Sequence, residues 1–341
     1  MPDIILMRRY PEPEGKTTGI GVYSDAIESA FQADGVEYED VLFRMTTEEG
    51  YPRCITEGFI RPFFDVANSK CHLYHATDEL CCIYFPFIRG RKIVTFHHVS
   101  RDREGRSLFL YPVWKLAARL AVRYSDIIVV PSEETKKELV SVFRAKENKI
   151  RVIMHGPDPM FRDEGRPREK LIGFVGTLIE RKNVAAGLRA FKIFTKMPGT
   201  EGYRFVICGD GPLKKDLLAL SDDLGISERV FFISDLSRRE LFDLYNDMAV
   251  YANPSMHEGL GLTALEAQAC GVPVVFFREA DIPAEATTYF VPSSDESQFA
   301  ANMHRLIFDN EYRESVTGSA KDVPDRGYMD KLYEIYGSIK K

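Results

Sequence analysis

The segment Asn253–Val275 carries the residue types best suited to chemistry. It joins the end of one expected strand to a turn, a helix that begins at Leu262 and a further strand. Gly259 and Gly261 lie in the turn, where residues without a side chain let the backbone approach a ligand closely. Unpaired N–H groups and the positive end of the helix dipole then favour a bound phosphate. The turn therefore predicts a phosphate-binding site.

Two glutamates flank this turn. Glu258 lies in the loop before the helix, and Glu266 lies eight positions later, inside it. Carboxylates at these two places can accept hydrogen bonds from hydroxyl groups on either side of a bound phosphate. The structural alternative is that Glu258 caps the helix and that Glu266 is a solvated acid on its surface.

This segment resembles the conserved two-glutamate region of the retaining family 4 glycosyltransferases, the group 1 enzymes with the GT-B fold. Both glutamates keep the family spacing, and Leu260 replaces the usual Phe. Four more segments resemble family motifs, and the similarity is dense from about Ser125 to Leu306. These segments are Phe174–Asn183, Cys208–Pro212, Ser125–Ser132 and Ile153–Asp158.

The resemblance implies a role for each residue of the segment. Glu266 would bind the ribose hydroxyls of a nucleotide sugar, and Glu258 would lie near the hydroxyls of the transferred sugar. Backbone N–H groups around Gly259, Leu260 and Gly261 would face the sugar and the phosphate. Such donors stabilise anions, and carboxylates accept hydrogen bonds from vicinal hydroxyls.

Arg181 and Lys182 follow the expected strand that ends at Val175. Adjacent basic residues in a loop are commonly solvated, which is the structural alternative. The resemblance implies instead that they neutralise the diphosphate of the donor, where charge develops on the leaving group. Many relatives carry Arg directly after the glycine of this strand, where this chain has Thr177.

The first half of the chain offers three further candidates. Gly19 and Gly21 follow a long loop and precede a helix. The resemblance implies that they belong to a glycine-rich loop that closes over the donor phosphates. The alternative is that they only give the chain a flexible entry into the helix. His97 ends an expected strand, at the edge where open α/β sheets bind ligands. The resemblance implies that His97 contacts the transferred sugar, although His98 replaces the Asp that commonly follows it. A metal site at these two histidines is disfavoured, because adjacent strand residues point to opposite faces.

Short apolar runs alternate with helical periods along the whole chain, which predicts parallel sheets covered by helices. The expected fold class is α/β: a GT-B arrangement of two Rossmann-like domains facing across a cleft, with the C-terminal helix crossing back to the first. We place an acceptor-side domain at 1–163, a nucleotide-sugar donor domain at 164–324 and the returning helix at 325–341, which we expect to pack on the first domain. The strands expected in the first half are 3–7, 39–43, 71–75, 92–97, 126–130 and 149–154, and those in the second are 171–175, 203–208, 230–233, 249–252 and 272–276.

Composition bounds the class of protein. The 341 residues are 45% hydrophobic and 28% charged, which excludes disordered, collagenous and disulfide-stapled chains. A net charge of −6 argues against a nucleic-acid partner. The longest apolar runs are far shorter than the roughly 18 residues that span a bilayer, and the N-terminus lacks the pattern of a signal peptide. Six cysteines without a C-x-x-C pair favour buried thiols in a reducing cytoplasm.

Charge is unevenly distributed within the first domain. Residues 89–123 hold nine basic residues against two acids, whereas residues 1–58 hold five basic residues against twelve acids. Lys115, Arg119 and Arg123 are spaced to form one stripe on a helix. The stripe could meet a membrane at the inner face or a phosphorylated acceptor, and the alternative is the wet edge of a buried helix.

These observations predict a retaining, metal-independent glycosyltransferase. It would move a sugar from a nucleotide-diphosphate sugar, its co-substrate, to an acceptor hydroxyl of a glycan, a glycolipid or a small-molecule glycoside, and it would need no cofactor. A non-catalytic sugar-binding relative is one alternative. An NAD-dependent Rossmann oxidoreductase is another, but Ser24 occupies the third glycine position and Arg44 follows the second strand where an acid is needed.

Overall fold

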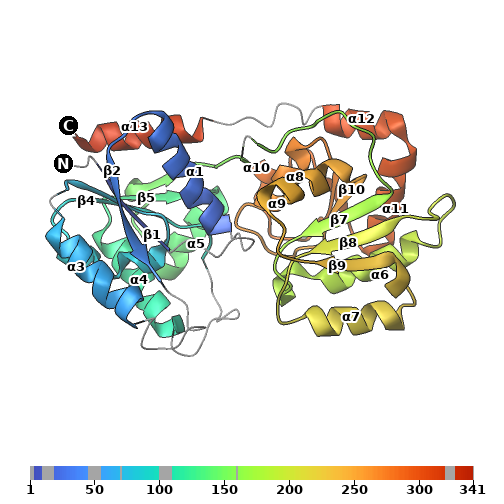
Figure 1. The fold of residues 1–341 in the computed structure, drawn as a ribbon, viewed down its shortest axis with the longest axis horizontal. Coiled ribbons are helices and arrows are strands. Elements are labelled where there is room, and N and C mark those ends of the chain that lie inside the picture. Colours follow the sequence, from blue (N-terminus) through green and yellow to red (C-terminus); the bar gives the residue numbers. More distant parts are fainter. Residues whose placement is uncertain are drawn as a thin grey trace. The chain divides into compact units, whose positions relative to one another are not determined.

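The computed structural model describes residues 4–9, 19–44, 55–69, 71–99, 110–158, 160–318 and 327–340 (Figure 1). These residues form two compact units. The first unit contains the described residues up to His155 together with the C-terminal helix, and the second contains those from Gly156 to Gly318. No helix in the described part of the chain is long and apolar enough to cross a bilayer.

The first unit is built on a sheet of six parallel strands in the order β2-β1-β3-β4-β5-β6. Central strand β1 places Ile5, Leu6 and Met7 out of contact with solvent, as a parallel sheet covered on both faces requires. The strands are β1 Ile4–Arg9, β2 Tyr38–Phe43, β3 Leu73–Ala76, β4 Arg91–Thr95, β5 Ile127–Val130 and β6 Ile150–Val152.

Helices cover both faces of this first sheet. One face packs on a core that includes Trp114 of α4, and the other packs on a core that includes Phe31 of α1. The sequence did not predict α3 with the π-helical turn Thr56–Ile60 before it, or the 3-10 segment Glu79–Phe87. The helices are α1 Gly19–Ala33, α3 Arg61–Asn68, α4 Leu110–Tyr124 and α5 Glu133–Phe143; the expected start of α4 at residue 107 lies outside the described residues.

The C-terminal helix α13, Tyr328–Lys340, belongs to the first unit. Its buried residues recur at helical spacing, and Leu332 and Tyr336 pack into the same core as Phe31. The Tyr336 hydroxyl lies 2.7 Å from Nδ1 of the buried His75 on β3. The chain therefore returns to the first unit at its end, as the predicted fold class requires.

The second unit repeats the architecture with six parallel strands in the order β12-β11-β10-β7-β8-β9. The short strand β12 was not predicted, because three residues carry too little periodicity to be distinguished from a loop. The strands are β7 Leu171–Val175, β8 Arg204–Cys208, β9 Val230–Ile233, β10 Val250–Asn253, β11 Val274–Phe277 and β12 Val291–Ser293.

The helices of the second unit follow the predicted alternation. The spacing of Ser237 and Glu240 predicts a capping box, and the two residues form one at the start of α8. The helices are α6 Val184–Phe194, α7 Lys214–Asp223, α8 Arg238–Asp247, α9 Leu262–Ala269, α10 Ala284–Thr287, α11 Glu296–Phe308 and α12 Asn310–Gly318.

The second unit begins at Gly156, somewhat before the expected position 164. The reason is the buried amide of Asn246, which holds the incoming chain. Its Nδ2 donates to the carbonyl of Arg162 at 3.1 Å, and its Oδ1 accepts from the N–H of Glu164 at 3.0 Å. The connecting segment is thus hydrogen-bonded to the second unit along its length.

Candidate functional site

Two neighbouring strands of the second unit carry most of the candidate residues. Strands β7 and β10 pair in parallel, so the loops that follow them leave the sheet at the same edge. The loop after β7 contains Arg181 and Lys182, and the loop after β10 contains Glu258. The N–H of Met256 donates to the carbonyl of Arg181 at 2.8 Å, which joins the two loops directly.

The loop after β7 is also held by the Gly-Asp-Gly-Pro turn after β8. A Cβ atom on Gly209 would lie 2.0 Å from the carbonyl oxygen of Gly176, and one on Gly211 would lie 2.5 Å from that of Leu178. The N–H of Leu178 donates to the carbonyl of Asp210 at 2.9 Å. Only glycine permits this contact of backbone with backbone, which fixes the loop that carries the two basic residues.

Glu258 forms a buried ionic cluster with the two basic residues. Its Oε1 accepts a hydrogen bond from Nζ of Lys182, and its Oε2 lies 3.1 Å from Nη1 of Arg181. The same Arg181 nitrogen donates to the carbonyl of His257 at 3.0 Å. Glu258 and Lys182 are each 8% exposed, so the alternative that these basic residues are merely solvated is wrong for Lys182.

The cluster contains two cations and one carboxylate. Burial alone would raise the pKa of Glu258, but Lys182 and Arg181 outweigh it and the pKa is lowered. Burial lowers the pKa of Lys182 and the charge of Arg181 adds to this, while Glu258 opposes it. Both pKa values are lowered: the two cations keep Glu258 ionised, and burial together with Arg181 disfavours the charged form of Lys182. An anion bound beside Lys182 and Arg181 would favour their charged forms.

Helix α9 begins next to this cluster without a side-chain cap. Gly261 is the residue before the helix; its φ of 76° is in the left-handed region, and no side chain accepts from the first turn. The alternative that Glu258 caps the helix is therefore wrong, since its carboxylate is bound to Arg181 and Lys182. Leu260 is 5% exposed and anchors the turn, and Gly259 precedes it. The start of α9 suits an anionic ligand.

Glu266 occupies a different environment inside α9. It is 5% exposed, and its Oε2 accepts a hydrogen bond of 2.9 Å from the hydroxyl of Tyr245. Burial raises its pKa to about 7, and the hydrogen bond from Tyr245 opposes the rise only in part. The alternative of a solvated helical acid is wrong for this residue.

Tyr251 connects the two halves of the site, a role that the sequence did not predict. Its buried hydroxyl accepts from the N–H of Val175 at 3.2 Å and lies 2.9 Å from Oγ1 of Thr263 in the first turn of α9. The hydroxyl thus ties the end of β7 to the start of α9. A usable signal existed, because a tyrosine inside an apolar strand needs a partner for its hydroxyl.

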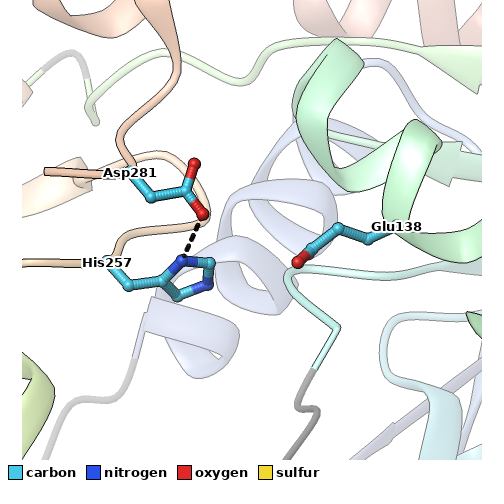
Figure 2. A group of neighbouring side chains, drawn as sticks. All are labelled: Glu138, His257 and Asp281. Atoms are coloured by element: carbon cyan, nitrogen blue, oxygen red, sulfur yellow. Dashed lines mark hydrogen bonds and ion pairs between the residues drawn. The ribbon is translucent and has the colours of Figure 1, made fainter.

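His257 and Asp281 contact each other next to Glu258 and fix the segment Met256–Glu258 (Figure 2). Nδ1 of His257 lies 2.9 Å from Oδ2 of Asp281. The N–H of Glu258 donates to the carbonyl of Asp281 at 3.0 Å, and the N–H of Asp281 donates to that of Met256 at 2.8 Å. Glu138, also drawn, belongs to α5 of the first unit.

The remaining three candidates lie in the first unit. His97 follows β4 and its Nε2 donates to the carbonyl of Thr77 at 2.9 Å. Burial lowers the pKa of His97, so the ring is neutral and Nδ1 is left as an acceptor. The ring of His97 lies edge-on to the ring of Tyr23, with 4.7 Å between the ring centroids. Tyr23 belongs to α1, whose first turn contains Gly19 and Gly21. The structure therefore groups these three within one unit.

The basic stretch is only partly available on the surface. Arg101, Arg103 and Arg106 lie outside the described residues. Lys92 is used internally, since its Nζ donates to the carbonyls of Ile88 and Gly90 at 3.1 and 2.8 Å. The predicted stripe on α4 is exposed, and the opposite face of that helix is buried around Trp114, as expected for the outer edge of a packed helix. The stripe consists of Lys115, Arg119 and Arg123.

Solved structures define the class of fold. The chain superposes on HepE from Anabaena in complex with UDP and glucose with a TM-score of 0.74 at 15% identity, over 99% of this chain and 100% of that one. Sucrose-phosphate synthase from Thermosynechococcus elongatus gives a TM-score of 0.77 at 15% identity, over 98% of both chains. Together with the two parallel sheets, this confirms the predicted GT-B class of α/β fold.

Sequence comparisons then give the family. The family model described as Glycosyl transferases group 1 matches residues 157–323, and the one described as Glycosyltransferase Family 4 matches residues 58–161. D-inositol 3-phosphate glycosyltransferase from Mycobacterium marinum is 32% identical over 58% of this chain and 46% of its own length. The chain spans about half the length of the curated relatives it matches. It belongs to the group 1 glycosyltransferases, as the resemblance predicts.

Removing the Tyr251 hydroxyl tests its connecting role. We expect Tyr251→Phe to lower the free energy of unfolding by about 1–3 kcal/mol, because the N–H of Val175 loses a buried acceptor. Nucleoside diphosphate affinity, measured by calorimetry, should weaken several-fold. Tyr336→Phe is the matched control, since it removes a buried hydroxyl from the first unit and should cost stability without changing this affinity. Equal affinities in the two variants would refute the role.

Proposed function

We propose that the chain is a retaining glycosyltransferase that moves a sugar from a nucleotide-diphosphate sugar to an acceptor hydroxyl. The observation that carries the proposal is the buried cluster of Arg181, Lys182 and Glu258, which places two cations beside the uncapped start of α9. A diphosphate is an anion that two cations and a helix N-terminus can bind together. The two cations then stabilise the charge that develops on the leaving diphosphate.

The two glutamates take different parts in this proposal. Glu258 is the internal counter-ion of the cluster, and a bound diphosphate would take over that task. Its carboxylate would then be available to accept hydrogen bonds from hydroxyls of the transferred sugar. Glu266 lies deeper, beside Tyr245, and would accept from the ribose hydroxyls of the nucleotide. Gly259, Leu260 and Gly261 would present backbone N–H groups to the sugar and phosphate.

We place the acceptor on the first unit, with His97 contacting the transferred sugar. The neutral ring of His97 is oriented by Thr77, which leaves one nitrogen able to accept a hydrogen bond from a hydroxyl. Gly19 and Gly21 would approach the donor phosphates. The leaving phosphate would take the proton of the acceptor hydroxyl on the same face, and the proposal assigns no side chain as a nucleophile.

The comparisons support a nucleotide-sugar donor. HepE was solved in complex with UDP and glucose, and the relative from Mycobacterium marinum is named a D-inositol 3-phosphate glycosyltransferase. We propose a uridine-diphosphate sugar as the first donor to test. The proposed acceptors remain a glycan, a glycolipid or a small-molecule glycoside, and the proposed reaction needs neither metal nor cofactor because Arg181 and Lys182 supply the positive charge.

We further propose a cytoplasmic protein with a peripheral contact at the inner membrane face. The five cysteines within the described residues are all free and buried, which agrees with a reducing compartment. The basic stretch 89–123 is the part proposed to contact the membrane, and nucleic acid is not among the proposed partners.

The experiment that tests the function combines a ligand panel with one variant. Thermal shifts with UDP-, GDP-, ADP- and dTDP-sugars identify the donor, because a ligand that binds only the folded state raises the melting temperature. We expect Glu258→Gln to bind the nucleoside diphosphate at least as tightly, since the negative charge of Glu258 no longer competes with the diphosphate for the two cations. Sugar transfer should fall at least about 100-fold.

Glu285→Gln, an exposed acid on α10, is the matched control and should transfer at the wild-type rate. Unchanged turnover in Glu258→Gln would contradict the proposed role of Glu258. Donor binding in the wild type with neither transfer nor slow donor hydrolysis would favour a non-catalytic sugar-binding protein. Binding of NAD without any nucleotide sugar would favour an oxidoreductase.

Glu266 allows a test that depends on pH. Its folded-state pKa of about 7 exceeds the ordinary 4.5, so ionisation destabilises the native state increasingly between these values. We expect Glu266→Gln to unfold with a free energy about 3 kcal/mol higher than the wild type near pH 8. The difference should vanish below about pH 4.5. The same variant should bind nucleotide at least about tenfold more weakly, and a variant that gains stability without losing affinity would contradict the ribose-binding role.

A further inference from the structure

A helical segment of the first unit turns large apolar side chains toward solvent. Ile60, Phe63 and Phe64 are 47%, 39% and 58% exposed, and with Ala67 they recur at the spacing of one helix face. This face begins in the π-helical turn and continues along α3, drawn in light blue in Figure 1. The opposite side of α3 packs inward through Pro62 and Val66.

A neighbouring segment extends the same surface. Phe87, at the end of the 3-10 segment, is 70% exposed, and its ring centroid lies 6.3 Å from that of Phe63. Phe63 also contacts Phe64 and the half-buried Tyr84, each at 5.6 Å. We call Ile60, Phe63, Phe64 and Phe87 the phenylalanine face. Single exposed apolar residues are common on protein surfaces and need no explanation. A contiguous exposed apolar surface of this kind marks a place of interaction.

Positive charge lies beside the phenylalanine face. Arg61 directly follows Ile60, and its side chain is 78% exposed. Arg89 and Arg91 follow Phe87 and are exposed, and Nη1 of Arg91 lies 3.1 Å from Oδ1 of Asp126. Asp65 is the exposed acid of α3, and it lies 4.0 Å from Arg61. This local charge is opposite to the net charge of −6 of the whole chain.

We propose that the phenylalanine face binds the surface of an anionic phospholipid membrane. Aromatic side chains enter the boundary between headgroups and acyl chains, and the arginines pair with lipid phosphates. A second copy of the chain fits less well, because a face-to-face contact would bring the arginines of both copies together. The proposal rests on the proposed membrane contact of the first unit and adds α3 and Phe87, which precede the basic stretch 89–123, as its apolar part. It lies outside the donor site and does not depend on the proposed sugar transfer.

Vesicle flotation tests the proposal with the full chain. We expect binding to phosphatidylglycerol-rich vesicles and little binding to pure phosphatidylcholine vesicles, with the binding weakened by salt. Phe64→Ser and Phe87→Ser should each lower the partition coefficient about tenfold, in proportion to the apolar area withdrawn from the membrane. The double substitution Arg89→Ala and Arg91→Ala should lower it about tenfold as well.

Leu218→Ser and Phe231→Ser are the matched controls, since each removes a 43% exposed apolar side chain from the second unit. Both should bind vesicles as the wild type does. Nucleoside diphosphate affinity should be unchanged in the phenylalanine variants, which shows that they are folded and separates this test from that of the donor site. Failure of the wild type to float with anionic vesicles, or equal loss in the control variants, would overturn the proposal. So would a dimer that Phe64→Ser abolishes, or capture of an acidic protein in place of lipid.

Discussion

The donor side of this protein depends on one buried interaction, the contact of Glu258 with Lys182 and Arg181. Burying charged groups is costly unless they are paired, and Glu258 pairs with both cations. Each residue comes from a loop that would otherwise be free to move away. The rest of the second unit can be understood as the framework that keeps these loops together, from the pairing of β7 with β10 to the contact of Gly209 with Gly176.

The fold could be predicted from the sequence because its signals are local and repeated. Strand β7 has the expected bounds and α9 begins at the expected Leu262, since buried parallel strands and a turn before a helix leave strong local patterns. The segment 55–68 was missed although its apolar residues recur at helical spacing. Its pattern is that of a buried helix face, and only the surrounding structure shows which way that face points.

The site could be predicted only in part, for a related reason. Glu258, Lys182 and Arg181 were identified by type and by resemblance, but neither could show that one carboxylate holds both cations. Tyr251 and Tyr245 were missed, because a tyrosine in an apolar strand or helix is ordinary core until its hydroxyl is given a partner. Hydrogen bonds between residues far apart in sequence leave no local pattern.

The two glutamates show how one short segment can supply two different chemical environments. Glu258 is kept ionised by adjacent cations, whereas burial raises the pKa of Glu266 and is opposed only in part by Tyr245 and Arg238. A group that must act beside a diphosphate needs its charge held in place, since a neutral acid would leave the cations unbalanced before the ligand arrives. Glu266 accepts from the hydroxyl of Tyr245 and lies where burial dominates its pKa. The separation of the two pKa values therefore follows from the neighbours of each carboxylate, and it is compatible with the different tasks that the proposed function assigns to them.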